Sequence, residues 1–240
     1  NINTQNNFNN NNNNYSNYSL YSDFIDFNTK KIHIKIKEFP NPNTIVLFPF
    51  EEKTGTKCLD GSQFGIYYGP GRGSGYNKVV IGFEGGGWCL EREVKNMANK
   101  CSKRIGSYYG TSKVWNKEYN YETNIYGGNK EKNKQFYNWH RFLIPYCDGI
   151  GNQGHIEDPI NNNGINLHFR GYKNTIESFK FIFTHVDINN LDTVVLEGCS
   201  SGGWSVINWM NTIENYLLKV NSRTVLLGIM NGGFFVGFEN

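Results

Sequence analysis

The 240-residue sequence contains no long apolar run and no dense block of basic residues. A helix that spans a bilayer needs roughly 20 consecutive apolar residues, so no transmembrane segment is predicted. The net charge is only +3, and the lysines at 130, 132 and 134 stand beside Glu131, which indicates a solvated loop. Proteins that bind nucleic acid usually concentrate Lys and Arg on one surface, so no nucleic-acid partner is expected.

The sequence also lacks the spacings of a metal site. Its five cysteines form no C-x-x-C pair, and its five histidines are scattered. Cys and His ligands at short, regular spacings are typical of structural zinc sites. We therefore expect neither a metal nor an organic cofactor. Disulfides are the better interpretation of the cysteines, and they indicate the secretory pathway or the extracellular space.

Apolar periodicity is missing from the first 28 residues. Nearly every residue from Asn6 to Asn14 is asparagine, and such a polar low-complexity tract cannot form a packed core. We interpret residues 1–28 as a disordered spacer and residues 29–240 as one domain. An alternating pattern predicts the first strand of that domain at residues 32–37.

The most informative stretch that is present runs from Thr193 to Gly203. Residues 193–196 predict a buried strand, and Gly198-Cys-Ser-Ser-Gly202 then fits the pattern G-x-S-x-G. Apolar residues at helical spacing follow from Trp204 onwards. A strand, a tight glycine turn and a helix in this order are typical of the nucleophile elbow of α/β-hydrolases. The stretch therefore predicts Ser200 as a catalytic nucleophile, and the plainer alternative is an ordinary strand-to-helix loop.

A second apolar run ends in glycines at residues 79–89, Val-Val-Ile-Gly-Phe-Glu-Gly-Gly-Gly-Trp-Cys. In α/β-hydrolases a glycine-rich loop after an early strand supplies backbone amides to the oxyanion hole. We predict the amides of Gly86 and Gly87 as donors, with Ser201 as a third. Neither a following Lys-Ser/Thr nor G-x-G-x-x-G is present, so a phosphate-binding loop is not predicted.

Six blocks in chain order resemble the pectin acetylesterase/Notum family. They are Cys58-Leu-Asp-Gly-Ser62, Phe83-Glu-Gly-Gly-Gly-Trp-Cys89, Asn138-Trp139, Ile144-Pro-Tyr-Cys-Asp-Gly149, Phe169-Arg-Gly171 and Gly198-Cys-Ser-Ser-Gly-Gly203. The resemblance implies an α/β-hydrolase-like fold, in which helices flank a central mixed or parallel sheet. It also implies cleavage of acyl esters, with an O-acylated carbohydrate or an acylated protein as substrate.

The same resemblance implies a pairing of the cysteines. By it, Cys89 pairs with Cys101 and Cys58 pairs with Cys147. Cys199 then stays free, and we expect it to be a small buried residue rather than a rival nucleophile. In two places this sequence departs from the family, with Asn208-Trp-Met210 where His-Cys-Asp is frequent, and Asn231-Gly-Gly-Phe-Phe235 for Asp-Ala-Gly-Phe-Phe.

A serine nucleophile needs a base and an acid that orients the base, and in α/β-hydrolases both follow the serine in the chain. After Ser200 this sequence contains no histidine and no aspartate. By the resemblance, the triad Asp and His lie beyond this chain, so we expect a C-terminally truncated domain that is inactive or nearly so by itself. Recruitment of His155 or His185 is the first alternative. A catalytically inactive relative that binds a glycan or lipid is the second.

The rest of the pattern alternates strands and helices. Strands are predicted at 44–48, 63–68, 78–84, 141–146, 193–197 and 224–229, and helices at 91–102, 172–185 and 203–219. The polar stretches 103–138 and 147–168 are predicted to be long loops that shape the pocket. Three tryptophans either stack on a sugar or belong to the core: Trp88, Trp139 and Trp204. We predict structural roles for three acidic residues. Glu84 forms hydrogen bonds with the glycine loop, and Asp148 and Asp158 cap loops.

Overall fold

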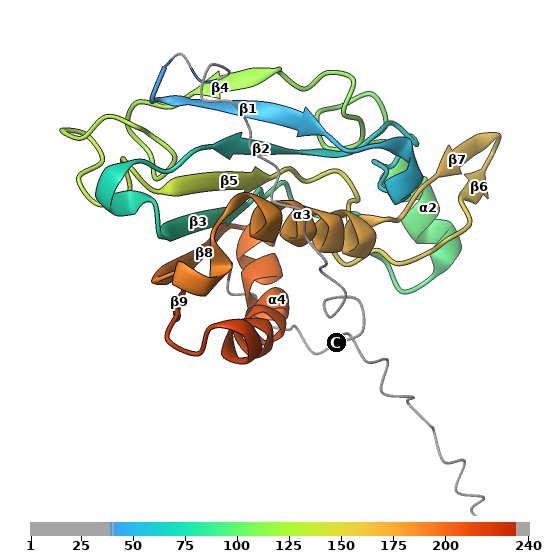
Figure 1. Ribbon diagram of the computed structural model, residues 1–240. Helices are drawn as coiled ribbons and strands as arrows, with labels where there is room; N and C mark the ends of the chain where they lie inside the picture. Colours follow the sequence, from blue (N-terminus) through green and yellow to red (C-terminus); the bar gives the residue numbers. More distant parts are fainter. Residues whose placement is uncertain (1–38, 40, 234–240) are drawn as a thin grey trace, which may run out of the picture.

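The structure is a computed structural model that describes residue 39 and residues 41–233 (Figure 1). The predicted disordered segment at 1–28, the predicted strand at 32–37, His33 and the pair Phe234-Phe235 lie outside the described residues.

One seven-stranded mixed sheet forms the centre of the molecule, with strand order β4-β1-β2-β5-β3-β8-β9 (Figure 1). Strands β5, β3, β8 and β9 are parallel to one another, while β4, β1 and β2 pair antiparallel to their neighbours. The strand bounds are β1 Thr44–Pro49, β2 Gly65–Gly69, β3 Lys78–Phe83, β4 Glu118–Asn120, β5 His140–Ile144, β8 Thr193–Cys199 and β9 Val225–Asn231.

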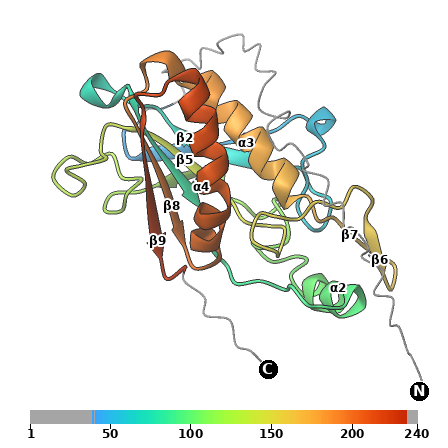
Figure 2. The same cartoon turned by 90° about the horizontal axis from the view of Figure 1, so that it is seen from below.

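Helices α3 (Gly171–His185) and α4 (Ser201–Val220) lie side by side over one face of this sheet (Figure 2). A third helix, α2 (Val94–Ser102), packs beside a hairpin formed by β6 (Ile160–Asn162) and β7 (Ile165–Leu167). Three short 3-10 helices occupy connections: η2 Glu52–Thr54, η3 Gly73–Gly75 and η4 Ile188–Asn190. The expected mixed sheet with flanking helices is therefore observed.

Strand β3 shows why the sequence has continuous apolar runs here. Val79, Ile81 and Phe83 pack toward α3 and α4, while Val80 belongs to a second cluster on the opposite face. Strands that are covered on both faces need apolar residues at every position, whereas a strand with one solvated face alternates. Aromatic side chains from β4 and from the segment that follows it pack on the second face, among them Tyr119, Tyr121 and Tyr126.

The strands and helices predicted within the described residues are present with shifts of a few residues at their ends, but the two long stretches are not entirely loop. They contain β4, β6 and β7, each three residues long. The hairpin β6–β7 turns at Asn163 and Gly164, which both have positive φ, 52° and 86°. An Asn-Gly pair is a strong hairpin signal, and this signal could have revealed both strands.

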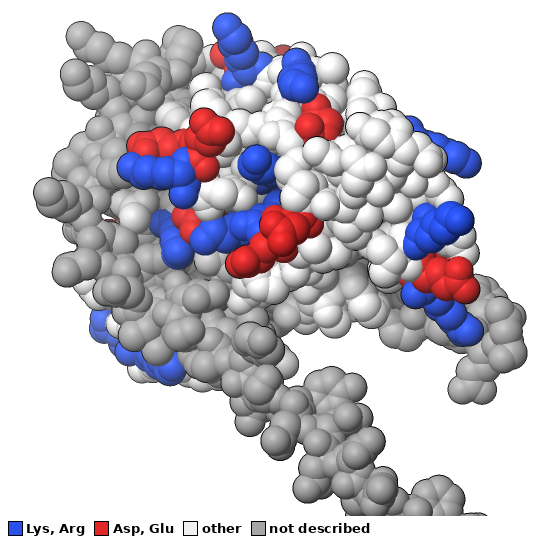
Figure 3. All heavy atoms as spheres, turned by 90° about the vertical axis from the view of Figure 1, so that its right-hand side faces the viewer, with Lys and Arg blue, Asp and Glu red and all other residues white. Residues whose placement is uncertain are grey.

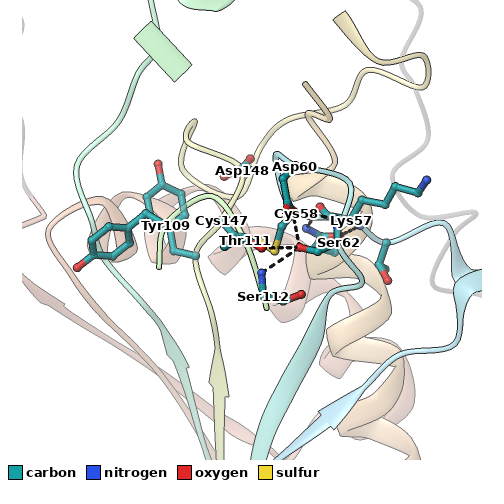
Figure 4. The surroundings of a disulfide bond; sticks show 12 residues. Lys57, Cys58, Asp60, Ser62, Tyr109, Thr111, Ser112, Cys147 and Asp148 are labelled. Carbon is teal, nitrogen blue, oxygen red and sulfur yellow. Dashed lines mark hydrogen bonds between the residues drawn. A yellow bond between two sulfur atoms is a disulfide. The ribbon is translucent and has the colours of Figure 1, made fainter. Parts of the chain in front are cut away.

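Both predicted disulfides are present, Cys58–Cys147 and Cys89–Cys101. Around the first bond, Asp60 accepts hydrogen bonds from the amide and hydroxyl of Ser62, and that hydroxyl also lies 3.2 Å from Thr111 Oγ1 (Figure 4). These contacts fix the loop at 107–113 to the segment that carries Cys58.

Charged side chains of both signs are mixed on the face shown in Figure 3, which carries no continuous basic surface. Within residues 41–233, the structure contains no helix with the length and apolar character needed to cross a membrane.

Candidate active site

Ser200 occupies a strained turn between β8, which ends at Cys199, and α4, which begins at Ser201. Its backbone has φ 54° and ψ −122°, a conformation that is costly for any residue with a Cβ atom. Two hydrogen bonds hold it: the Ser200 amide donates to Asn231 O at 2.8 Å, and the Trp204 amide donates to Ser200 O at 3.2 Å. The local geometry is that of the predicted elbow, with the side chain of Ser200 half-buried.

The glycines on both sides of Ser200 are required by close backbone contacts. A Cβ atom on Gly198 would lie 2.2 Å from Gly202 O, and one on Gly202 would lie 2.1 Å from Phe83 O. No side chain fits at such distances, so only glycine lets β8, α4 and β3 approach this closely.

The glycine loop that follows β3 touches this elbow directly. Phe83 is in register with Gly198, so the carboxyl ends of β3 and β8 meet at one edge of the sheet. A Cβ atom on Gly85 would lie 2.2 Å from Cys199 O and 3.3 Å from Ser200 Cβ. The structure therefore brings together the two segments that the sequence analysis singled out.

The three predicted amide donors differ in their surroundings. Gly87 has φ 64°, and a Cβ atom there would meet nothing within 4 Å. The amide of Ser201 opens α4, where the first N–H groups have no acceptor within the helix. The Gly86 amide already donates to Ser201 Oγ at 2.9 Å. Of the three amides, that of Gly86 therefore already has an acceptor.

Arg104 contacts the same loop, although no sequence motif marks it. Its Nη2 donates to Gly86 O at 2.9 Å across 18 residues of sequence. The guanidinium lies over the rings of Tyr109 and Tyr146, with its carbon 5.3 and 5.4 Å from the ring centroids. The hydroxyl of Tyr146 accepts a hydrogen bond from the Gly151 amide at 3.0 Å.

Glu84 precedes the glycines and is largely buried. Its amide donates to Ile144 O, and its carboxylate accepts a hydrogen bond from the Tyr146 amide at 3.3 Å. Burial raises the pKa of Glu84 to about 7, although hydrogen bonds from Tyr146 and Tyr108 act in the opposite direction. The amide and carboxylate of Glu84 thus join it to Ile144 and Tyr146, at and after the end of β5, whereas the sequence predicted bonds to the glycine loop itself.

Asp148 caps the loop that follows β5. Its buried carboxylate accepts hydrogen bonds from three backbone amides, those of Ile150, Asn152 and Gly154, at 3.2, 3.1 and 3.0 Å. Burial raises the pKa of Asp148, and these backbone hydrogen bonds oppose the rise. Asp158, the other predicted cap, is exposed.

Two of the four described histidines pack against the same tyrosine, Tyr68, away from the elbow. His140 is the first residue of β5, so it lies at the sheet edge opposite Ser200. Its ring nitrogens lie 3.0 Å from Tyr68 Oη and 3.1 Å from Tyr76 O, and burial lowers its pKa to about 4. His185 ends α3 and packs against the same tyrosine, Tyr68.

The other two histidines make separate contacts. His155 packs on the ring of Tyr172, and His168 lies against Gly61. Among the described residues, no hydrogen bond or ring contact joins a histidine to Ser200.

The remaining predictions concern Cys199 and the tryptophans. Cys199 is free, as expected, but it is exposed, so the expectation of a buried residue is wrong. The neighbouring strand β9 is itself exposed, with Ile229 at 41% and Met230 at 53%, and no described side chain covers the thiol. Trp139 is buried against Phe136 and belongs to the core, whereas Trp88 and Trp204 are 38% and 39% exposed near the elbow.

In the part of the chain that the structure describes, no three His, Cys, Asp or Glu side chains are grouped so that they could hold a metal ion. The candidate site thus consists of a serine in a strained turn, a glycine loop in contact with that turn, and aromatic side chains near them.

Comparison with known proteins identifies the family. The family model described as pectinacetylesterase matches residues 37–240. Pectin acetylesterases 7 and 11 of Arabidopsis thaliana are 32% and 31% identical over 184 residues, which cover 76% of this chain and 43% of each relative. The palmitoleoyl-protein carboxylesterase NOTUM of Schmidtea mediterranea is 24% identical over 209 residues, 86% of this chain and 36% of that protein.

The fold agrees with these relatives. A crystal structure of the Wnt deacylase Notum from Drosophila superimposes with a TM-score of 0.65 at 22% identity, covering 77% of this chain and 51% of that one. The chain spans less than half the length of the curated relatives named above. On the match over residues 37–240, the chain belongs to the pectinacetylesterase family.

Proposed function

We propose that the protein is a serine carboxylic-ester hydrolase that removes O-acyl groups through an acyl-enzyme. One observation carries the proposal: Ser200 stands at φ 54° in a strained turn, in direct contact with a glycine loop 115 residues away in sequence. Strain of this kind persists only where the surrounding structure holds it, and it is concentrated at functional sites.

In this mechanism the hydroxyl oxygen of Ser200 attacks the ester carbonyl carbon, and the carbonyl oxygen becomes negatively charged. The amides of Gly87 and Ser201 donate to that oxyanion, and the positive end of the α4 dipole favours the charge further. Gly86 joins them if its hydrogen bond to Ser201 Oγ is released. Collapse of the intermediate expels the alcohol, and water then hydrolyses the acyl-enzyme.

The mechanism also needs a base, which takes the proton of Ser200, and an acid, which orients the base. No described histidine contacts Ser200, and the relatives are more than twice as long as the matched region. We therefore assign the base and the acid to a part of the whole protein that these 240 residues do not include.

The substrates proposed are an O-acylated carbohydrate or an acylated protein. The names of the relatives, pectin acetylesterase and palmitoleoyl-protein carboxylesterase, support these two classes. The two disulfides support action in the secretory pathway or outside the cell, since such bonds persist in oxidising compartments.

The second candidate is a catalytically inactive relative that binds a glycan or lipid. The absence of a described histidine near Ser200 favours it, and the exposed rings of Trp88 and Trp204 could contact such a ligand. Activity of the full-length protein separates the two candidates.

The experiment compares the full-length protein, its Ser200→Ala variant and a control, Ser222→Ala, which changes an exposed serine after α4. With p-nitrophenyl acetate we expect Ser200→Ala to lower kcat/KM by about a thousandfold or more, and the control to match the unmodified protein. A fluorophosphonate probe should label the unmodified protein and the control alone. Hydrolysis that is unchanged in Ser200→Ala would refute the proposed nucleophile.

A parallel assay tests the assignment of the base. The 240-residue chain by itself should turn over the ester far more slowly than the full-length protein. If the two are equally active and Ser200→Ala abolishes both activities, the base lies within these residues and our assignment is wrong.

A further inference from the structure

We propose that Arg104 is a positioning residue that sets the direction of the Gly87 amide toward the oxyanion. This inference rests on the proposed function, because it assigns a role in the same site. It starts from the hydrogen bond between Arg104 Nη2 and Gly86 O, at 2.9 Å.

The carbonyl of Gly86 and the amide of Gly87 belong to one peptide unit. That unit is planar and trans, so its C=O and N–H point in opposite directions. A donor that fixes the direction of Gly86 O therefore fixes the direction of the Gly87 N–H as well. The Gly87 N–H therefore points away from the Arg104 guanidinium that bonds Gly86 O.

The charge of the guanidinium adds a second effect. A cation that donates to the carbonyl draws electron density through the peptide unit and makes the N–H at its other end a stronger donor. An oxyanion gains more from this than a neutral ester oxygen, because the interaction grows with the charge on the acceptor. Stabilisation that is larger in the transition state than in the ground state raises kcat.

A glycine loop needs such a support because glycine, which has no Cβ atom, can adopt many backbone conformations. Residues 85–87 are all glycine, and Gly87 has φ 64°. The disulfide from Cys89 to Cys101 holds one end of the loop against α2, and Arg104 follows Cys101 by one turn. Bonding of Arg104 to Gly86 O closes a ring that contains the disulfide and residues 86–89.

The guanidinium is itself held in one orientation. Tyr109 and Tyr146 contact it at 5.3 and 5.4 Å. The backbone carbonyl of Arg104 accepts hydrogen bonds from the amide and the hydroxyl of Ser107 at 3.0 and 2.7 Å. A planar group held by aromatic rings gives one hydrogen-bond direction, which a flexible lysine ammonium does not.

The test uses the full-length protein with Arg104→Lys and Arg104→Ala, and Arg92→Ala as the matched control. Arg92 is exposed and lies between the same two cysteines, so the control removes the same charge close to the loop. We expect both Arg104 variants to lower kcat by about ten- to a hundredfold, with KM within about twofold of the unmodified value. The control should change neither constant.

Two further readouts separate positioning from a purely structural role. A trifluoromethyl ketone adds reversibly to Ser200 Oγ and places an oxyanion at the site, so its Ki should rise in proportion to the loss in kcat/KM. Guanidinium at a sub-denaturing concentration should restore part of the kcat of Arg104→Ala and none of that of Arg92→Ala.

The outcomes are distinct. If Ser200→Ala abolishes turnover while both Arg104 variants keep kcat, the inference fails and the proposed function stands. A loss of kcat in Arg104→Lys with an unchanged Ki for the ketone also overturns it, because the amide would then not be the group affected. If Ser200→Ala keeps its activity, the proposed function itself fails.

Discussion

Buried ionisable side chains surround the glycine loop, and Glu84 precedes it directly in the chain. Its carboxyl group is largely withdrawn from water, which disfavours the charged form and raises its pKa to about 7. In the unfolded chain the same group titrates near 4.5. Between these two values the folded protein binds more protons than the unfolded one, so ionisation of Glu84 reduces stability as the pH rises through this window.

The variant Glu84→Gln stays neutral at every pH and should remove that penalty. The variant should gain stability relative to the unmodified protein as the pH rises. We expect the difference in their free energies of unfolding to grow by up to about 2 kcal/mol from pH ~5 to pH ~8. Urea denaturation at both values measures the difference. Glu118→Gln changes an exposed glutamate of β4 and provides the control. A difference between Glu84→Gln and the unmodified protein that does not vary with pH would contradict this account.

At the scale of elements, the junction of β3, β8 and α4 depends on glycine because three backbones meet there. Gly202 has no room for a Cβ atom, which would lie 2.1 Å from Phe83 O. Gly73, in contrast, has a positive φ of 53° but no atom within 4 Å of the same position. Comparing substitutions at these two glycines therefore separates the effect of close packing from the effect of backbone conformation.

We expect Gly202→Ala to reduce the free energy of unfolding by about 3 kcal/mol, because backbone atoms have to move apart. Gly73→Ala should cost only about 1 kcal/mol, the usual penalty for a Cβ atom at positive φ. Chemical denaturation of both variants gives the comparison. Equal losses would show that close contact at the elbow is not the cause.

The elements that could be predicted are those with strong apolar patterns. Residues 193–196 and 79–83 are continuous apolar runs, a pattern typical of strands that are buried on both faces. The strands β8 and β3 form there. The strand β4, with the sequence Glu-Tyr-Asn, has no such pattern, since it is an edge strand held by its pairing with β1. Arg104 could not be predicted either, because its role depends on where a loop returns in space.

At the scale of the whole molecule, two disulfides connect segments that flank the site. The bond Cys58–Cys147 closes a loop of 89 residues, and Cys89–Cys101 closes one of 12. Family resemblance alone predicts their pairing, since spacing does not determine which cysteines meet. The exposure of Cys199 cannot be predicted from the sequence, because it depends on the exposed strand beside it.

Replacing Cys58 and Cys147 together by alanine should destabilise the protein more than replacing Cys89 and Cys101. A cross-link restricts the unfolded chain more when its loop is longer, and the chain-entropy relation gives about 4.6 and about 2.8 kcal/mol for these loops. Thermal and urea unfolding of the two double variants provide the test. The opposite order would indicate that local packing around Cys89 outweighs the entropy of the unfolded chain.

The contact between the glycine loop and the elbow has a consequence for folding kinetics. The Gly86 amide and the Ser201 hydroxyl are 115 residues apart in sequence. Closing such a long loop has a large entropic cost, which must be met before the contacts it brings together can offset it. Strands β8 and β9 with α4 are neighbours in the chain, so we expect them to pair earlier. The glycine loop can meet the strained turn at Ser200 only when the long-range pairing of β3 with β8 is in place, so we expect the candidate site to be one of the last of the described parts to form.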